Sequence, residues 1–237
     1  MNRIQLAGVL WSLQIVFFVA NIVAQLAWTE PYSVFGYAIS DLGAVTCFTE
    51  PSTGRAICSP AHLVMNVGFI LAGVLMAAGA IALPLSIVRR RIDLISRVLL
   101  VIGGLGCAGV GLAPEDVALG AHTVAAVAAM VVGNIGLVLF GIGLRTNRRT
   151  LDTVALGLGT LGLIGVTWLI TLLLTGSPAR FSVGGLAERI AAFSLVFAQL
   201  VIGITLLIRP TSGTRAAADA DANPRWTKES SGYPQET

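Results

Sequence analysis

The side chains that could carry out acid–base or nucleophilic chemistry fall in a few short stretches of this 237-residue chain. One candidate catalytic set has Ser40 as nucleophile, His122 as general base and Asp41 as the group that orients the base. Ser33 and Asp116 are alternatives for the first and last of these roles. Such residues are typical of a serine hydrolase or transesterase, in which the base takes the hydroxyl proton as the oxygen attacks. The G-x-S-x-G turn that exposes such a serine in many hydrolases is absent from the sequence.

A metal site is a second hypothesis, with both histidines of the chain, His62 and His122, as candidate ligands. Two imidazoles, a carboxylate and a water in the open position are a known ligand set for zinc, which activates the water for hydrolysis. Neither histidine belongs to an H-x-x-x-H or H-E-x-x-H pair, so no single helix supplies two ligands. The G-x-x-x-x-G-K-[ST] phosphate loop is also missing, and we expect no cofactor.

The same regions can bind a ligand without catalysis, or can simply hold the protein together. In a binding site, Arg189 would receive an anionic headgroup or a carboxylate at the mouth of a pocket. In a structural role, Asp41 would pair with Arg189 or cap a short helix, and the histidines would bond to loop carbonyls. The candidate binding residues are Asp41, His62, Asp116, His122, Glu188 and Arg189.

Long apolar runs must position these residues. Hydrophobic residues make up 55% of the chain and charged residues only 11%, against about a quarter charged in a soluble domain. A membrane-crossing helix needs about 20 apolar residues. The six stretches of this kind are residues 4–28, 61–88, 95–112, 122–144, 151–175 and 186–208. We therefore predict an all-α, polytopic membrane protein in which residues 1–208 form a six-helix transmembrane bundle.

Arginines concentrate at alternate turns between these helices. They occur at residues 89–91 and again at 145, 148 and 149, whereas the opposite loops hold only Arg55 and Arg180. By the positive-inside rule, the N- and C-termini are cytoplasmic in a protein of the cell (plasma) membrane. The same asymmetry accounts for the basic pI of about 9.1, so we expect no nucleic-acid partner.

Residues 29–60 then form an extracytoplasmic loop, the only long connection between apolar runs. Cys47 and Cys58 lie within it, on the side of the membrane where disulfides persist, and we predict that they are bonded. Cys107 falls inside the third helix and is expected to be buried. Residues 209–237 are rich in Pro, Ser, Thr, Asp and Gly, which predicts a disordered cytoplasmic tail.

Two sets of residues should face other helices. Gln14, Asn21 and Gln25 share one face of the first helix and are too polar for lipid, so they should point into the bundle. Gly103, Cys107 and Gly111 recur every four residues in the third helix, a small-residue stripe on which another helix can approach closely.

Several short motifs together resemble those of one known family. They are Tyr32-Ser33, the run Ser40-Asp41-Leu42-Gly43, Asn66-x-Gly68-Phe69, Gly111-x-x-Pro114 with His122, and Glu188-Arg189. Over roughly residues 4–208, the chain resembles the domain-of-unknown-function 998 family of prokaryotic integral membrane proteins. The resemblance implies six or seven transmembrane helices and no established activity. The Cys47/Cys58 pair is not part of that pattern.

The leading functional hypothesis is an uncharacterised integral membrane protein whose extracytoplasmic polar pocket binds a membrane lipid or small amphiphile. One alternative is a membrane-embedded metal- or serine-dependent hydrolase acting on a lipid-linked substrate. Another is a non-catalytic scaffold subunit with a membrane-protein partner. A proton-coupled transporter is disfavoured, because no carboxylate lies in the middle of a predicted helix. These hypotheses depend on whether the polar residues converge in space.

Overall fold

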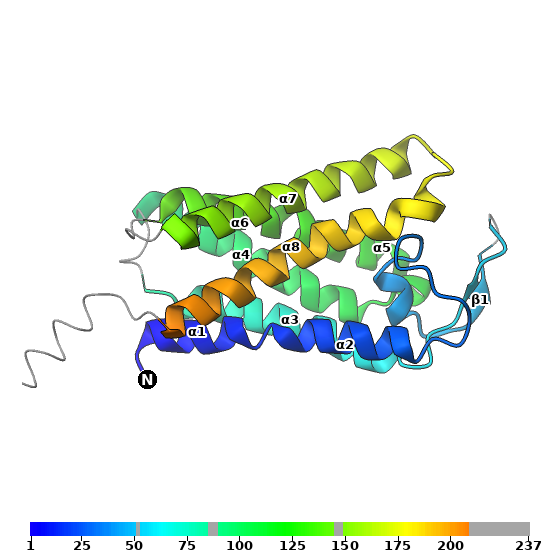
Figure 1. The fold of residues 1–237 in the computed structure, drawn as a ribbon, viewed down its shortest axis with the longest axis horizontal. Helices are drawn as coiled ribbons and strands as arrows, with labels where there is room; N and C mark the ends of the chain where they lie inside the picture. The colour runs from blue at the N-terminus through cyan, green and yellow to red at the C-terminus, as the bar shows by residue number, and fades with distance from the viewer. Residues whose placement is uncertain (51–52, 85–89, 145–148, 209–237) are drawn as a thin grey trace, which may run out of the picture.

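The computed structural model describes residues 1–50, 53–84, 90–144 and 149–208. Its helices run lengthwise in a single bundle (Figure 1). Six helical spans in the described part of the chain are long and apolar enough to cross a membrane: Arg3–Leu26, His62–Ala82, Arg91–Leu112, Glu115–Gly143, Thr150–Leu174 and Arg180–Ile208. The predicted all-α, six-helix membrane bundle is confirmed.

The spans are built from eight α-helices and one π-helical segment, named here as in Figure 1. In chain order these are α1 (Arg3–Ser12), α2 (Ile15–Leu26), α3 (His62–Ala82), α4 (Arg90–Leu112), α5 (Glu115–Val127), the π-helical η2 (Ala128–Val132), α6 (Gly133–Gly143), α7 (Arg149–Leu174) and α8 (Arg180–Ile208). Helix α3 packs along α4, α8 packs against α1 and α7, and α6 packs against α4 and α7. Neighbours in sequence are thus mostly neighbours in space.

The two ends of the bundle differ. One end carries the connection from residue 27 to residue 61 and is called the loop end; the other carries the N-terminus and is called the terminal end (Figure 1). The predicted disordered tail, residues 209–237, lies outside the described residues. So do Arg89, Arg145 and Arg148, on which the predicted orientation partly depends.

The first predicted helix, 4–28, corresponds to the span Arg3–Leu26, in which the regular α-helix is interrupted between Ser12 and Ile15. Between α1 and α2 the backbone tightens into a three-residue turn, with the N–H of Gln14 donating to the carbonyl of Trp11 at 3.2 Å. The Gln14 side chain points into the bundle, where its Nε2 donates to Gln199 Oε1 at 2.8 Å and to the carbonyl of Ala72 at 3.1 Å. These two hydrogen bonds satisfy the Nε2 group of Gln14, whereas its Oε1 atom is buried without a hydrogen-bond partner among the described residues.

Other helix ends also differ from the predicted bounds. Helix α3 ends at Ala82 rather than at residue 88, because Leu83 precedes a proline and takes an extended conformation; residues 85–88 lie outside the described chain. Helices predicted to begin at residues 95, 122 and 186 begin at Arg90, Glu115 and Arg180. Hydropathy marks only the lipid-crossing part of a helix, whereas helical hydrogen bonding continues through polar turns beyond it.

Small residues let the helices approach one another closely. A Cβ added at Gly103 would lie 2.7 Å from the Cα of Gly133, and one added at Gly111 would lie 2.3 Å from the carbonyl oxygen of Asn66. The buried Cys107 thiol between them faces the Phe69 carbonyl at 3.4 Å. The predicted stripe on α4 is therefore a packing surface for α3 and α6.

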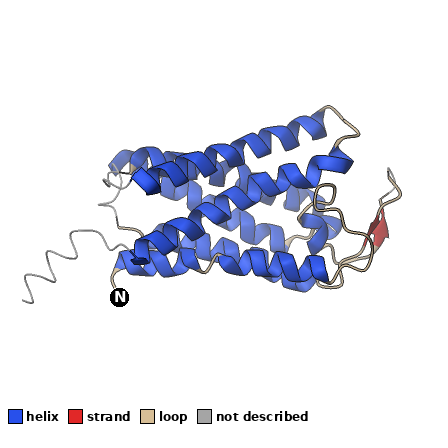
Figure 2. Cartoon of the chain, in the orientation of Figure 1, coloured by secondary structure: helices blue, strands red, loops and turns tan. Residues whose placement is uncertain are grey.

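The connection at the loop end folds back over the helices. It contains the 3₁₀ turn η1 (Ser40–Gly43) and a hairpin of two short antiparallel strands, β1 (Phe48–Thr49) and β2 (Ala56–Ile57), which projects from the bundle (Figure 2). A disulfide joins Cys47 to Cys58 at the base of this hairpin, as predicted, with the two Cα atoms 4.3 Å apart. The disulfide therefore links the two strands of the hairpin covalently where the hairpin joins the rest of the loop.

Candidate functional site

The dipeptide Glu188-Arg189 of α8 holds the backbone of the loop. Glu188 Oε2 accepts a hydrogen bond from the N–H of Ile39 at 3.0 Å. Arg189, only 4% exposed, donates through Nη1 to the carbonyl of Tyr37 at 2.6 Å and through Nη2 to the Tyr32 hydroxyl. Burial raises the pKa of Tyr32 to about 12, so this hydroxyl remains a neutral partner for the arginine. The two side chains therefore clamp consecutive stretches of the loop to α8.

Helices α3 and α5 hold the η1 turn from the other side. Asn66 on α3 donates from Nδ2 to the carbonyl of Gly43 at 2.9 Å. Asp116 on α5 accepts from the backbone N–H groups of Val45 and Thr46, at 3.1 and 2.8 Å. Ser59 completes the fixation by donating its hydroxyl to the carbonyl of Leu42 at 2.6 Å. The S-D-L-G run is thus a docked turn with backbone contacts on both sides.

Three carboxyl groups converge beneath this turn, one each from the loop, α5 and α8. Asp41, 4% exposed, accepts from the N–H of Ala38 at 2.7 Å and forms a side-chain hydrogen bond with Glu115. Burial, reinforced by the negative charge of Glu115, raises the pKa of Asp41 to about 8. Glu188 is close enough to interact electrostatically with both. A hydrogen bond between two carboxyl groups requires a proton, so the Asp41–Glu115 pair shares one at neutral pH.

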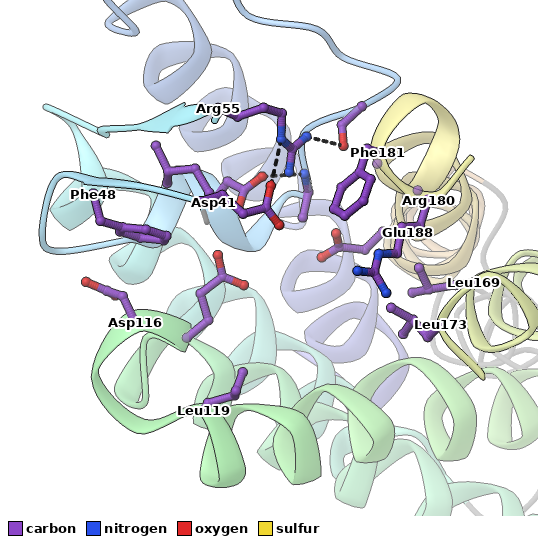
Figure 3. Close-up of a pocket in the computed structure, with 17 residues that line it drawn as sticks. Asp41, Phe48, Arg55, Asp116, Leu119, Leu169, Leu173, Arg180, Phe181 and Glu188 are labelled. Carbon is purple, nitrogen blue, oxygen red and sulfur yellow. Dashed lines mark hydrogen bonds and ion pairs between the residues drawn. The ribbon is translucent and has the colours of Figure 1, made fainter. Parts of the chain in front are cut away.

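These groups open into a cleft of about 560 Å³ at the loop end (Figure 3). Its polar wall has Asp41, Glu115, Asp116, Glu188, Arg55 and Arg180, and its apolar wall includes Phe48, Leu119, Leu169, Leu173 and Phe181. Arg55 is already paired, with its Nε 3.0 Å from Glu50 and its Nη1 donating to the Gly36 carbonyl at 3.1 Å. Arg180 stacks 4.5 Å above the ring of Phe181. No carboxylate within the described residues forms an ion pair with Arg180.

A second hollow, a groove of about 330 Å³, adjoins the cleft and extends down the bundle between α5 and α7. It is mostly apolar, with Ala126, Val127, Val166 and Ile170 among its walls. Ser40, Glu115, His122 and Glu188 also line it. Six residues line both hollows: Ala38, Glu115, Leu119, Leu169, Leu173 and Glu188. The cleft and the groove are therefore adjacent and share part of their walls.

The two histidines are separated by the fold. His122 lies inside α5, lines the groove, and contacts the Ala113 carbonyl through Nδ1 at 2.8 Å. His62, at the first position of α3, contacts the Ser59 carbonyl through Nδ1 at 2.9 Å and lines neither hollow. Across the described residues, no three His, Cys, Asp or Glu side chains are arranged to hold a metal ion. Both imidazole rings contact a backbone carbonyl, as the structural role considered for the histidines predicts.

The candidate serines are also committed to other partners. Ser40 is buried beside Glu115, and in the described chain its hydroxyl has no hydrogen bond to His122. Ser33 accepts from the N–H of Gly36 at 3.2 Å within a turn. Nucleophilic catalysis by serine needs a base in contact with the hydroxyl. The structure gives Ser40 a carboxyl neighbour instead of an imidazole.

Of the predicted binding residues, the structure brings Asp41, Asp116 and Glu188 to the cleft and His122 to the adjoining groove. His62 lies outside both hollows, and Arg189 donates hydrogen bonds to Tyr37 and Tyr32 of the loop rather than pairing with Asp41. Glu115, which was not among the predicted binding residues, is the partner of Asp41. The Pro114-Glu115-Asp116 sequence signals a helix start, but its pattern does not tell which acidic side chain turns toward the loop.

Comparison with known proteins gives one match. A family model described as "Protein of unknown function (DUF998)" matches residues 13–218. The searches of curated proteins and of solved structures gave no match.

Proposed function

The chain belongs to the DUF998 family of proteins of unknown function, and we propose that this multi-pass membrane protein binds a lipid or a similar small amphiphile at its loop end. The polar headgroup would occupy the cleft beneath the hairpin. The hydrocarbon chain would lie in the groove between α5 and α7.

The observation that carries this proposal is that the polar cleft and the apolar groove lie side by side and share six wall residues. An amphiphile needs a polar compartment next to an apolar one, and Glu115, Leu119 and Glu188 belong to the walls of both. The two volumes, about 560 and 330 Å³, lie within the roughly 300–1,000 Å³ typical of ligand sites. Groove residues such as Leu173 and Val127 are 56% and 48% exposed, so an acyl chain can reach them from the bilayer.

The loop end is inferred to face away from the cytoplasm. Two features support this orientation. The disulfide Cys47–Cys58 lies at the loop end, and disulfides persist in extracytoplasmic compartments. Among the described arginines, Arg3 and Arg91 lie at the terminal end, near the starts of α1 and α4. The ligand would then come from the outer leaflet.

The test compares two valine positions on α5. Val127 lines the groove, whereas Val124, 72% exposed, does not. Protein purified in a mild detergent should retain lipid, measured by mass spectrometry of extracts, and Val127→Trp should lose most of it by filling the groove. Val124→Trp adds the same bulk outside the groove and should retain lipid like the wild type. Equal retention by both variants, or no retained lipid in the wild type, would contradict the proposal.

A hydrolase acting on the bound lipid is a second candidate, favoured by the Asp41–Glu115 pair. A carboxyl group whose pKa is about 8 holds its proton at neutral pH and can donate it to a leaving group. Asp41→Asn would abolish such an activity while leaving lipid retention intact. If Asp41→Asn loses bound lipid as well as activity, Asp41 acts in lipid binding and not in catalysis.

A further inference from the structure

We propose that the cleft recognises an aminophospholipid, whose headgroup joins a phosphate to a primary ammonium; this inference rests on the lipid-binding function proposed above. The ammonium would lie against the carboxyl groups of Glu115 and Glu188. The phosphate would lie against the guanidinium of Arg180.

The charges left over in the cleft select against a purely anionic headgroup. Arg55 and Glu50 neutralise each other in an ion pair of 3.0 Å. Asp116 uses both oxygens on the backbone of the loop. Asp41, Glu115, Glu188 and Arg180 remain, so three carboxyl groups stand against one guanidinium. A headgroup with phosphate alone would face repulsion from the carboxylates, whereas a zwitterion meets both signs.

The aromatic rings favour a primary over a quaternary ammonium. A quaternary ammonium has no N–H donors and is usually held by the faces of several aromatic rings. The cleft wall has two aromatic rings, Phe48 and Phe181, and Arg180 already lies 4.5 Å from the centre of the Phe181 ring. A primary ammonium instead offers three N–H donors, which match the carboxylate oxygens.

Arg180 and Glu188 are placed to hold the two ends of one zwitterion. They lie eight residues apart on α8, hence on one face of the helix and roughly 12 Å apart along its axis. Figure 3 shows both side chains extending from α8 toward the cleft. Together these two side chains would hold the phosphate and the ammonium of a single headgroup.

The experiment offers detergent-solubilised protein an equimolar mixture of phosphatidylethanolamine, phosphatidylglycerol and phosphatidylcholine with identical acyl chains. Native mass spectrometry counts each bound lipid. Wild-type protein should prefer phosphatidylethanolamine over both others by about tenfold, the effect of a charge-assisted hydrogen bond. Glu188→Gln keeps an oxygen for the Ile39 N–H and should bring the ethanolamine-to-choline ratio close to one. Arg180→Gln should weaken both lipids alike and preserve their ratio.

Charge-matched controls come from residues outside the cleft. Glu30 in the loop and Arg91 at the terminal end are both exposed. The variants Glu30→Gln and Arg91→Gln should bind the three lipids as the wild type does. Soluble glycerophosphoethanolamine should compete only at roughly 100-fold excess or more, because it lacks the chains that the groove holds. Displacement at equimolar concentration would identify a soluble amine as the ligand and overturn the proposal.

The remaining outcomes separate the two proposals. If the protein retains lipid but binds phosphatidylglycerol or phosphatidylcholine as tightly as phosphatidylethanolamine, the headgroup inference is wrong and lipid binding stands. If Glu188→Gln leaves the preference for phosphatidylethanolamine unchanged, the Glu188 carboxylate does not bind the ammonium, and the headgroup inference also fails. If no lipid of any class is retained, the proposed function itself fails.

Discussion

Glu188 on α8 and Ile39 in the loop are 149 residues apart in sequence, yet Glu188 Oε2 lies 3.0 Å from the backbone nitrogen of Ile39. This hydrogen bond fixes the loop just before the η1 turn, and so sets where Asp41 enters the cleft. The same carboxyl group lines both the cleft and the groove. The Glu188 side chain thus anchors the loop and also forms part of the cleft that the loop covers.

The Asp41–Glu115 contact predicts that stability falls as pH rises. Asp41 has a pKa of about 8 in the folded protein against 3.8 ordinarily, so the folded state binds more protons between these values. Its stabilising contribution is complete below about pH 4 and is lost as pH rises through 8. Thermal unfolding in detergent should therefore give a Tm at least about 3 °C higher at pH 6 than at pH 9.

Asp41→Asn is the matched variant for this pH effect. Its amide can still accept from the Ala38 N–H and donate to Glu115, as the protonated acid does, but it cannot ionise. The variant should fold, and its Tm should change less between pH 6 and pH 9 than that of the wild type. The Asp41–Glu115 pair does not govern the pH dependence of stability if the wild-type Tm rises with pH. The same conclusion follows if the Tm of Asp41→Asn changes between pH 6 and pH 9 as much as that of the wild type.

Two adjacent glycines on α8 should respond oppositely to alanine. A Cβ at Gly185 would lie 2.0 Å from the Tyr37 carbonyl oxygen, whereas one at Gly184 would meet nothing closer than 4.0 Å. Gly185→Ala must push the loop away and should cost about 2 kcal/mol or more. Gly184→Ala should be neutral or stabilising by up to about 1 kcal/mol, through better helix propensity. Unfolding temperature and protease sensitivity of the loop measure both; equal behaviour would argue against tight docking.

Arg189 should tolerate no substitution, including lysine. Its guanidinium bonds to the Tyr37 and Gly185 carbonyls and to the Tyr32 hydroxyl while almost fully buried. An ammonium lacks the planar fork needed for all three, so Arg189→Lys and Arg189→Gln should each destabilise the protein by about 2–4 kcal/mol. The exposed Arg91→Gln serves as control and should be near neutral. A lysine variant as stable as the wild type would refute this structural role.

The proposed orientation predicts where thiols can be labelled. After mild reduction of intact cells, an impermeant maleimide should label Cys47 and Cys58 from outside, whereas Cys107, 6% exposed within the bundle, should stay unlabelled. The double variant Cys47→Ser/Cys58→Ser should abolish the signal. Labelling that appears only after permeabilisation would place the loop end in the cytoplasm and reverse the topology.

Much of the architecture was predictable from the sequence because it follows from local properties. The length and hydropathy of each apolar run determined the six spans, and their separation left one long connection with Cys47 and Cys58 in it. The inward faces of Gln14 and Asn21 followed equally from helical periodicity, and both are buried. These features need only the rise of a helix and the cost of polar groups in hydrocarbon.

The site required the tertiary structure. Which side chain meets Asp41 depends on how α5 is rotated and where that helix begins, and the partner is Glu115 rather than the predicted Arg189. His62 and His122 share a chemistry but point to different carbonyls, because α3 and α5 present them on different faces. The position of the groove beside the cleft depends on the spacing between α5 and α7, whose side chains line it. Composition and periodicity carry no information about that spacing, since it depends on every helix contact at once.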